Sequence, residues 1–170
     1  MAAGTDIQAA LGFADDPWAF FDHYLCFNRW MCDPAVARRF CEDGWPTMKW
    51  LAGHGVEYPA SGLYRATREA VPRSHRPVGG GQAVIDVLAA ACRRAGAEIA
   101  LGNRAARLLT DGGRVYGVEA QGERASAGAV VLASGGFARN ELLLARYYPR
   151  FAAQYGTGLR HRTRTWATGC

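Results

Sequence analysis

The chain lacks the features that would place it in a membrane, secreted or metal-binding class. No stretch approaches the roughly 18 consecutive apolar residues that a bilayer-spanning helix needs. The amino terminus has no basic segment followed by an apolar core, as a secretory signal would. Five cysteines are present, but they form no CxxC pair and have no histidines at metal-ligand spacing. We therefore expect a cytoplasmic protein with reduced thiols, no metal site and no membrane span.

Motifs for nucleoside triphosphates and nucleic acids are also missing. The sequence contains no GxxxxGK[ST] loop. Its formal net charge is +5, but three positive charges belong to Arg160, Arg162 and Arg164 and the others are dispersed. Without a basic face or an aromatic platform, we expect no nucleic-acid partner. With 170 residues, 49% of them hydrophobic, the chain can form one ordinary domain or two small pieces with a core.

Two helices are predicted in the N-terminal part of the chain. The segments Pro17 to Trp30 and Pro34 to Gly53 each begin with an Asp-Pro step, which is typical of a capped helix with proline in its first turn. Aromatic residues recur near i, i+3 and i+6 in the first segment: Trp18, Phe20, Phe21, Tyr24, Phe27 and Trp30. This spacing favours a packed helix face over an aromatic substrate box. We expect the two helices to pair.

The central part reads as a helix followed by strands, with glycines at the joints. Apolar residues recur at helical spacing after Gly81, and they are Val84, Ile85, Val87, Leu88, Ala91 and Cys92. Two arginines and then Gly96 provide the stop signal. Strands are predicted at 97–101, 105–109 and 114–120, and the Asp-Gly-Gly step at 111–113 predicts a hairpin turn. Cys92 is expected to be buried on the apolar face of the helix.

A short apolar run at 129–133 stops abruptly at Ser134, Gly135 and Gly136. A continuous apolar run without alternation predicts a strand buried on both faces, as in a parallel sheet. Ligands of open α/β sheets bind beyond the carboxyl ends of strands, where glycine lets the backbone approach a pyrophosphate or ribose. A helix is predicted next, over 139–147. Taken alone, the pattern also fits an ordinary strand-to-helix turn.

The pattern from Pro72 to Pro149 resembles the flavoprotein family shared by fumarate reductases, succinate dehydrogenase flavoprotein subunits and 3-ketosteroid dehydrogenases. The stretches that carry the resemblance are PRSHRPVGGGQAVIDVLAAACRRAGAEI, NRAARLLTDGGRVYGVEA and AGAVVLASGGFARNELLLARYYP. A fainter similarity runs through TDIQAALGFADDP and MKWLAGHGVEYP. The resemblance implies the α/β fold class, as part of a FAD-binding Rossmann-like domain with a helical N-terminal part. It is specific to the family and not to one substrate.

The resemblance also implies FAD as the cofactor and suggests where this chain meets it. The segment 103–105 would lie against the adenine, with backbone groups of Ala105 facing its edge. Ser134, Gly135 and Gly136 match the family's turn near the adenosine and pyrophosphate. For Ala105 the alternative is an ordinary core alanine.

A cationic segment precedes the glycine turn, and the family places a similar HRP segment close to the cofactor. We therefore predict cofactor-binding roles for His75 and Arg76. Arg73, His75 and Arg76 can all supply positive charge, which stabilises a reduced flavin or polarises a carbonyl. The alternative is that they bond to neighbouring carbonyls or to a cofactor phosphate. The resemblance identifies no catalytic residue in this chain, because the family's principal ones lie beyond it.

The sequence departs from the family in what it omits. The opening strand, its GxGxxG turn and the following acidic residue, which hold the pyrophosphate and ribose, are not present. The last twelve residues, LRHRTRTWATGC, match neither a helix nor a strand period. We divide the chain into a helical segment at 1–71, an adenosine-side α/β segment at 72–158 and a basic tail at 159–170. The tail is interpreted as a frameshift product or as a natural disordered terminus.

The parent activity implied by the resemblance is dehydrogenation or reduction of a carbon-carbon bond next to a carbonyl. The substrate would be a small molecule, either a steroid, a dicarboxylate or another enone, and the electron acceptor stays open. Two alternatives remain for this chain. It could be a non-catalytic nucleotide-binding module, or a fragment without a stable function.

Overall fold

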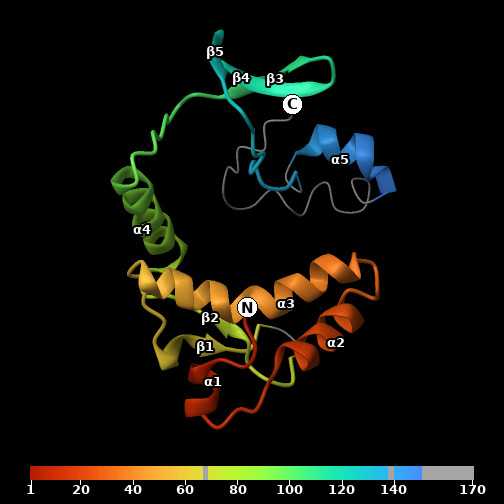
Figure 1. The fold of residues 1–170 in the computed structure, drawn as a ribbon. Helices are drawn as coiled ribbons and strands as arrows, with labels where there is room; N and C mark the ends of the chain where they lie inside the picture. Colours follow the sequence, from red (N-terminus) through yellow and green to blue (C-terminus); the bar gives the residue numbers. More distant parts are fainter. Residues whose placement is uncertain (67–68, 138–139, 151–170) are drawn as a thin grey trace. The chain divides into compact units, whose positions relative to one another are not determined.

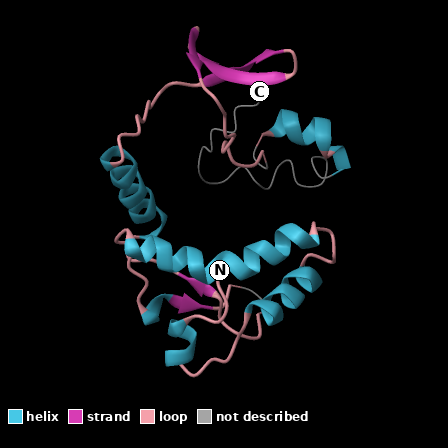
Figure 2. Ribbon diagram, in the orientation of Figure 1, coloured by secondary structure: helices cyan, strands magenta, loops and turns pink. Residues whose placement is uncertain are grey.

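The structure is a computed structural model, and it describes residues 1–66, 69–137 and 140–150. The chain divides into two compact units, Met1–Ile99 and Ala100–Cys170, which are described separately below. The first unit is mainly helical and the second contains an antiparallel sheet (Figures 1 and 2). The predicted tail at 159–170 lies outside the described residues. Within the described residues, no helix is long and apolar enough to cross a membrane.

The first unit begins with three helices whose starts are fixed by side-chain caps. They are α1 (Asp6–Ala10), α2 (Pro17–Phe27) and α3 (Pro34–Gly53). The carboxylates of Asp16 and Asp33 accept hydrogen bonds from the first free backbone amides of α2 and α3, and each helix has proline in its first turn. The helices α2 and α3 pack against each other (Figure 1). The predicted pair of helices is therefore confirmed.

The core of this unit lies between α2 and α3. Its buried members are Ala3, Phe20 and Cys41, with Phe21 and Tyr24 packed against them. The prediction of a packed aromatic face is right for these phenylalanines and the tyrosine, but wrong for three other aromatic residues of the pattern, which are exposed: Trp18, Phe27 and Trp30. The helix ends at Phe27 because Arg29 and Trp30 have positive φ angles, 53° and 59°, which a right-handed helix cannot contain.

Two short strands and a long helix complete the first unit. Strand β1 (Leu63–Tyr64) pairs antiparallel with β2 (Ser74–His75), and α4 (Gly80–Arg94) follows the glycine turn. The helix confirms the prediction and ends with two arginines at its C-terminus. Cys92, however, is exposed, and no residue of α4 is buried. The apolar periodicity correctly located the helix, but a periodic face is buried only where another element covers it.

The second unit contains a three-stranded antiparallel sheet. The strands are β3 (Ala105–Asp111), β4 (Arg114–Ala120) and β5 (Glu123–Ser126), in the order β3-β4-β5. The turn between Asp111 and Arg114 is the predicted hairpin, and both predicted strands that flank it are confirmed. Residues 97–101, also predicted as a strand, form no strand.

The apolar run at 129–133 is not a strand either. Its side chains Val131 and Leu132 are 88% and 66% exposed. A central parallel strand needs a hydrogen-bonding partner on each side, and the part of the chain that the structure describes pairs no strand with this run. The predicted helix is present over a shorter range as α5 (Glu141–Tyr147), capped by the Asn140 side chain. Residues 138 and 139 lie outside the described part.

Candidate functional site

The cationic segment 73–76 is held against the N-terminal part of the first unit. Strand β2 brings Ser74 and His75 opposite Tyr64 and Leu63 of β1. The Arg76 amide donates a hydrogen bond to the Gly62 carbonyl, at 2.9 Å. On the other side, the Ala2 amide donates to the Arg73 carbonyl, also at 2.9 Å. Segment 73–76 is therefore fixed through its backbone from two directions.

The Arg73 side chain forms a buried ion pair within the first unit. Its Nε and Nη2 atoms donate to the two carboxylate oxygens of Asp15, at 2.7 and 2.6 Å. The side chains of Arg73 and Asp15 are only 4% and 1% exposed, and the guanidinium lies 5.1 Å from the centre of the Phe20 ring. Of the three guanidinium nitrogens, Nη1 is the one that is buried and has no hydrogen-bond partner among the described residues. A bidentate pair of this kind neutralises the charge of Arg73 and orients the backbone beside it.

Gln8 connects this ion pair to the segment before it. Its amide nitrogen donates to Asp15 Oδ2 at 3.0 Å and to the Pro72 carbonyl at 2.8 Å. The side-chain oxygen of Gln8 accepts a hydrogen bond from the Thr5 backbone amide at 3.0 Å, and the Thr5 hydroxyl accepts one from the Gln8 backbone amide. The two residues thus form a capping box on α1. One buried polar network thus links the start of α1 to segment 72–75.

His75 has a neighbour at each ring nitrogen. Nε2 lies 3.1 Å from the Thr5 hydroxyl, and Nδ1 lies 3.1 Å from the Arg73 carbonyl oxygen. Burial lowers the pKa of His75 below its ordinary value, and the hydrogen bond to Arg73 opposes this only in part. In this structure His75 thus contacts a neighbouring carbonyl, which is the alternative role considered for this segment from the sequence.

Arg76 differs from its two basic neighbours. Its side chain is exposed and lies over the Tyr64 ring, 5.1 Å from the ring centre. Within the described residues, it has no ion pair. Of the three basic side chains in segment 73–76, Arg76 is the one whose positive charge is open to a ligand.

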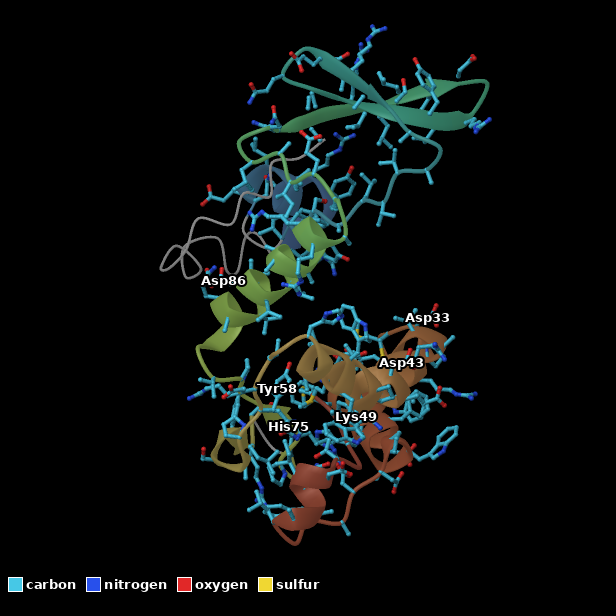
Figure 3. The ribbon with its side chains drawn as sticks, turned by 60° about the vertical axis from the view of Figure 1, so that its left-hand side comes forward. Asp33, Asp43, Lys49, Tyr58, His75 and Asp86 are labelled. Atoms are coloured by element: carbon cyan, nitrogen blue, oxygen red, sulfur yellow. The ribbon has the colours of Figure 1, made fainter. Side chains whose placement is uncertain are left out.

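A cavity of about 500 Å³ lies beside this segment, within the first unit. The lining residues are Met1, Val36, Arg39, Phe40, Asp43, Gly44, Thr47, Met48, Leu51, Tyr58 and His75. Asp43, Tyr58 and His75 are labelled in Figure 3. Arg39 and Asp43 pair with each other at 2.9 Å, and burial raises the pKa of Tyr58. The cavity is thus mainly apolar, with a neutral phenol and an imidazole among its polar groups.

The other predicted cofactor residues belong to the second unit. Ala105 begins β3 and is exposed, so that it is not a core alanine. Ser134, Gly135 and Gly136 are also exposed, and a side chain added at either glycine would meet no atom within 4 Å. Gly135 has a φ angle of 78°, a conformation that glycine adopts without strain. The backbone at these glycines is therefore open to close approach by a ligand. The sequence holds no GxGxxG turn for the pyrophosphate.

The sequence indicated the basic segment but not the residues that hold it. Thr5, Gln8 and Asp15 were not singled out, although the Thr-x-x-Gln spacing of a capping box was a usable signal for the first two. Asp15 carried no such signal, because it lies 58 positions from Arg73. The two groups of predicted cofactor residues lie in different units, His75 and Arg76 in the first and the other four in the second.

Comparisons with known proteins identify a family and several similar proteins. A family model described as a FAD binding domain matches residues 1–169. A fumarate reductase (cytochrome) of Shewanella frigidimarina is 29% identical over 157 residues, which cover 87% of this chain and 27% of the relative. An NADH:fumarate oxidoreductase of Klebsiella pneumoniae is 26% identical over 87% of this chain and 17% of its own length. The chain thus spans about a quarter or less of these relatives.

A solved structure is similar as well. The open conformation of a flavocytochrome c3 fumarate reductase superimposes with a TM-score of 0.79 and 28% sequence identity. The alignment covers 88% of this chain and 28% of that one. At this identity and coverage, the likeness extends to the sequence as well as to the fold.

Proposed function

Because the chain belongs to the family of FAD binding domains, we propose that it forms the FAD-contacting part of an oxidoreductase that reduces or dehydrogenates a carbon-carbon bond next to a carbonyl. The carrying observation is the similarity to fumarate reductases over nearly nine-tenths of this chain. We favour a fumarate-like dicarboxylate as substrate over a steroid, because the named relatives act on fumarate.

Named residues of each unit are assigned to the cofactor. When bound, FAD supplies the hydride chemistry. In the second unit, backbone groups of Ala105 would bind the adenine edge, and the open backbone of Ser134, Gly135 and Gly136 would lie against the adenosine and pyrophosphate. In the first unit, Arg76 would bring its exposed charge near the flavin, where positive charge favours the anionic reduced form. The adjacent His75 would help to hold this segment in place for the cofactor through its contacts with Thr5 and the Arg73 carbonyl. The electron acceptor is not assigned.

The first test is the visible absorption spectrum of the chain purified after expression with excess riboflavin. We expect flavin bands and FAD released in a stoichiometric amount. Replacing Arg76 with Gln should lower the FAD content, whereas replacing Arg38, an exposed arginine of α3 that pairs with Glu42, with Gln should not.

Two other outcomes of this test would contradict the proposal in different ways. A colourless but folded protein that still binds adenine nucleotides would identify a non-catalytic nucleotide-binding module. A colourless aggregate would identify a fragment without a stable function. If flavin is bound, oxidation of a reduced dye by fumarate and by a steroid enone distinguishes the two substrate classes.

A further inference from the structure

His75 lies beside two partners that together determine where its proton is. We propose that Thr5 is a positioning residue that holds His75 as a neutral imidazole protonated on Nδ1, so that Arg76 alone provides the free positive charge of segment 73–76. The location of this segment beside the flavin rests on the proposed function. The assignment of the proton rests on this chain alone.

The proton positions follow from what each partner can do. The Arg73 carbonyl can only accept a hydrogen bond, so the ring atom 3.1 Å from it, Nδ1, carries the proton. In the neutral ring Nε2 is then an acceptor, and the Thr5 hydroxyl 3.1 Å away donates to it. The Thr5 hydroxyl oxygen also accepts a hydrogen bond from the Gln8 backbone amide at 3.1 Å, so that this hydroxyl is both a donor and an acceptor. No other neutral tautomer satisfies both contacts.

The groups around the ring also disfavour a second proton. Burial is the largest cause of the lowered pKa, and the nearby amino group of Met1 adds to it. On the segment itself, Arg73 is already neutralised by Asp15. Among the residues that line the cavity with His75, Asp43 is paired with Arg39, and the pKa of Tyr58 is raised so that its phenol stays neutral. Glu69 acts on the Met1 amino group rather than on His75.

The three basic residues of this segment therefore have different roles. Arg73 anchors the segment, His75 packs as an uncharged donor and acceptor, and Arg76 remains as the exposed cation. With both ring nitrogens occupied, His75 is not available to exchange a proton with a substrate or with reduced flavin. The pH dependence of any flavin bound here would therefore contain no step from His75 near neutral pH.

The test is a nitrogen-15 NMR titration of the histidine rings in the flavin-free chain, with Thr5→Ser and Thr5→Asp as the paired variants. We expect the wild type and Thr5→Ser to show His75 protonated on Nδ1 only, with a titration midpoint below the ordinary value of about 6.5. In Thr5→Asp the cap on α1 keeps an acceptor, but the carboxylate cannot donate to Nε2. The midpoint of His75 should then rise above about 6.5, with a proton on each nitrogen below it.

Three outcomes would overturn the proposal. These are a proton on Nε2 in the wild type, a midpoint in Thr5→Asp that equals the wild-type one, or a loss of the single tautomer in Thr5→Ser. If Thr5→Asp does not fold, Thr5→Ala removes the donor to Nε2 instead, and a His75 midpoint in it that equals the wild-type one would equally contradict the role of Thr5. Because the titration uses no flavin, its failure is distinct from failure of the chain to bind FAD.

Discussion

At the scale of single residues, the stability of the first unit depends on the partner of a buried charge. The Asp15–Arg73 pair is nearly inaccessible to solvent, and Gln8 donates a further hydrogen bond to the carboxylate. Removing one partner of such a pair costs far more than the pair itself contributes, because the other charge remains buried. The exposed Arg39–Asp43 pair has a similar length but 71% and 48% exposed side chains, so that water solvates both charges.

This contrast gives a prediction for two identical chemical changes. We expect Asp15→Asn to lower the free energy of unfolding by about 3 kcal/mol, because it leaves the Arg73 guanidinium buried without its counter-charge. Asp43→Asn should change it by less than about 0.5 kcal/mol. Urea denaturation followed by circular dichroism measures both. Equal effects of the two substitutions would show that the Arg73 guanidinium is not buried in solution.

The sequence indicated the basic segment because three basic side chains cluster within four positions before a glycine turn. It could not show that they are used differently. Arg73 finds Asp15 and His75 finds Thr5 across 58 and 70 positions of sequence. Local spacing carries no information about contacts at that range, which arise only when the helices have packed.

At the scale of elements, one glycine in α3 allows the N-terminal segment to lie on the helix. A Cβ atom added at Gly44 would lie 2.9 Å from the Met1 carbonyl oxygen and 3.2 Å from Ala2 Cα. Both are backbone atoms, which cannot move away as the end of a flexible side chain could. At Gly53, at the end of the same helix, an added Cβ would meet nothing within 4 Å.

We therefore expect Gly44→Ala and Gly53→Ala to act in different ways. The first should destabilise the protein by about 1–3 kcal/mol, because crowding in a packed site outweighs the better helix propensity of alanine. The second should be neutral or stabilising by up to about 1 kcal/mol. Thermal unfolding of the two variants beside the wild type makes the comparison. A stabilised Gly44→Ala would mean that residues 1 and 2 do not lie on α3 in solution.

The elements were predictable where the signals are local. The start and end of α3 and the strands beside the Asp111 turn follow from caps, proline and glycine, which act within a few residues. The run at 129–133 shows the limit of this reasoning. Its apolar residues are typical of a central strand, which needs a neighbouring strand on each side. The sequence of the run does not determine whether such neighbours are present.

At the scale of the whole molecule, both units leave large apolar side chains exposed, but they differ in whether they also bury one completely. The first unit buries a phenylalanine fully in its core, while the second leaves Val131 and Leu132 exposed and fully buries no large apolar side chain among its described residues. Adjacent exposed apolar residues of this kind promote binding to other apolar surfaces, including those of other copies of the same chain.

Replacing Val131 and Leu132 together with lysine should therefore improve solubility without destabilising the chain. We expect lower fluorescence of an added hydrophobic dye and a free energy of unfolding within about 0.5 kcal/mol of the wild type, as for exposed positions in general. Leu109→Ala is the matched control, since Leu109 is only 5% exposed and should cost about 2 kcal/mol. A large destabilisation by the double substitution would show that the run is covered in solution.

The anchoring of residues 2–5 against segment 73–75 has a consequence for how the protein is made. Thr5 meets its partner His75 across 70 positions, and the Ala2 amide needs the Arg73 carbonyl. Closing so long a loop costs entropy before any contact is gained. During synthesis, residues 2–5 leave the ribosome about 70 positions before their partners and must remain unpaired until the segment around residue 75 has also emerged. Residues 2–5 thus emerge before segment 73–75 but reach their final positions only after it has followed.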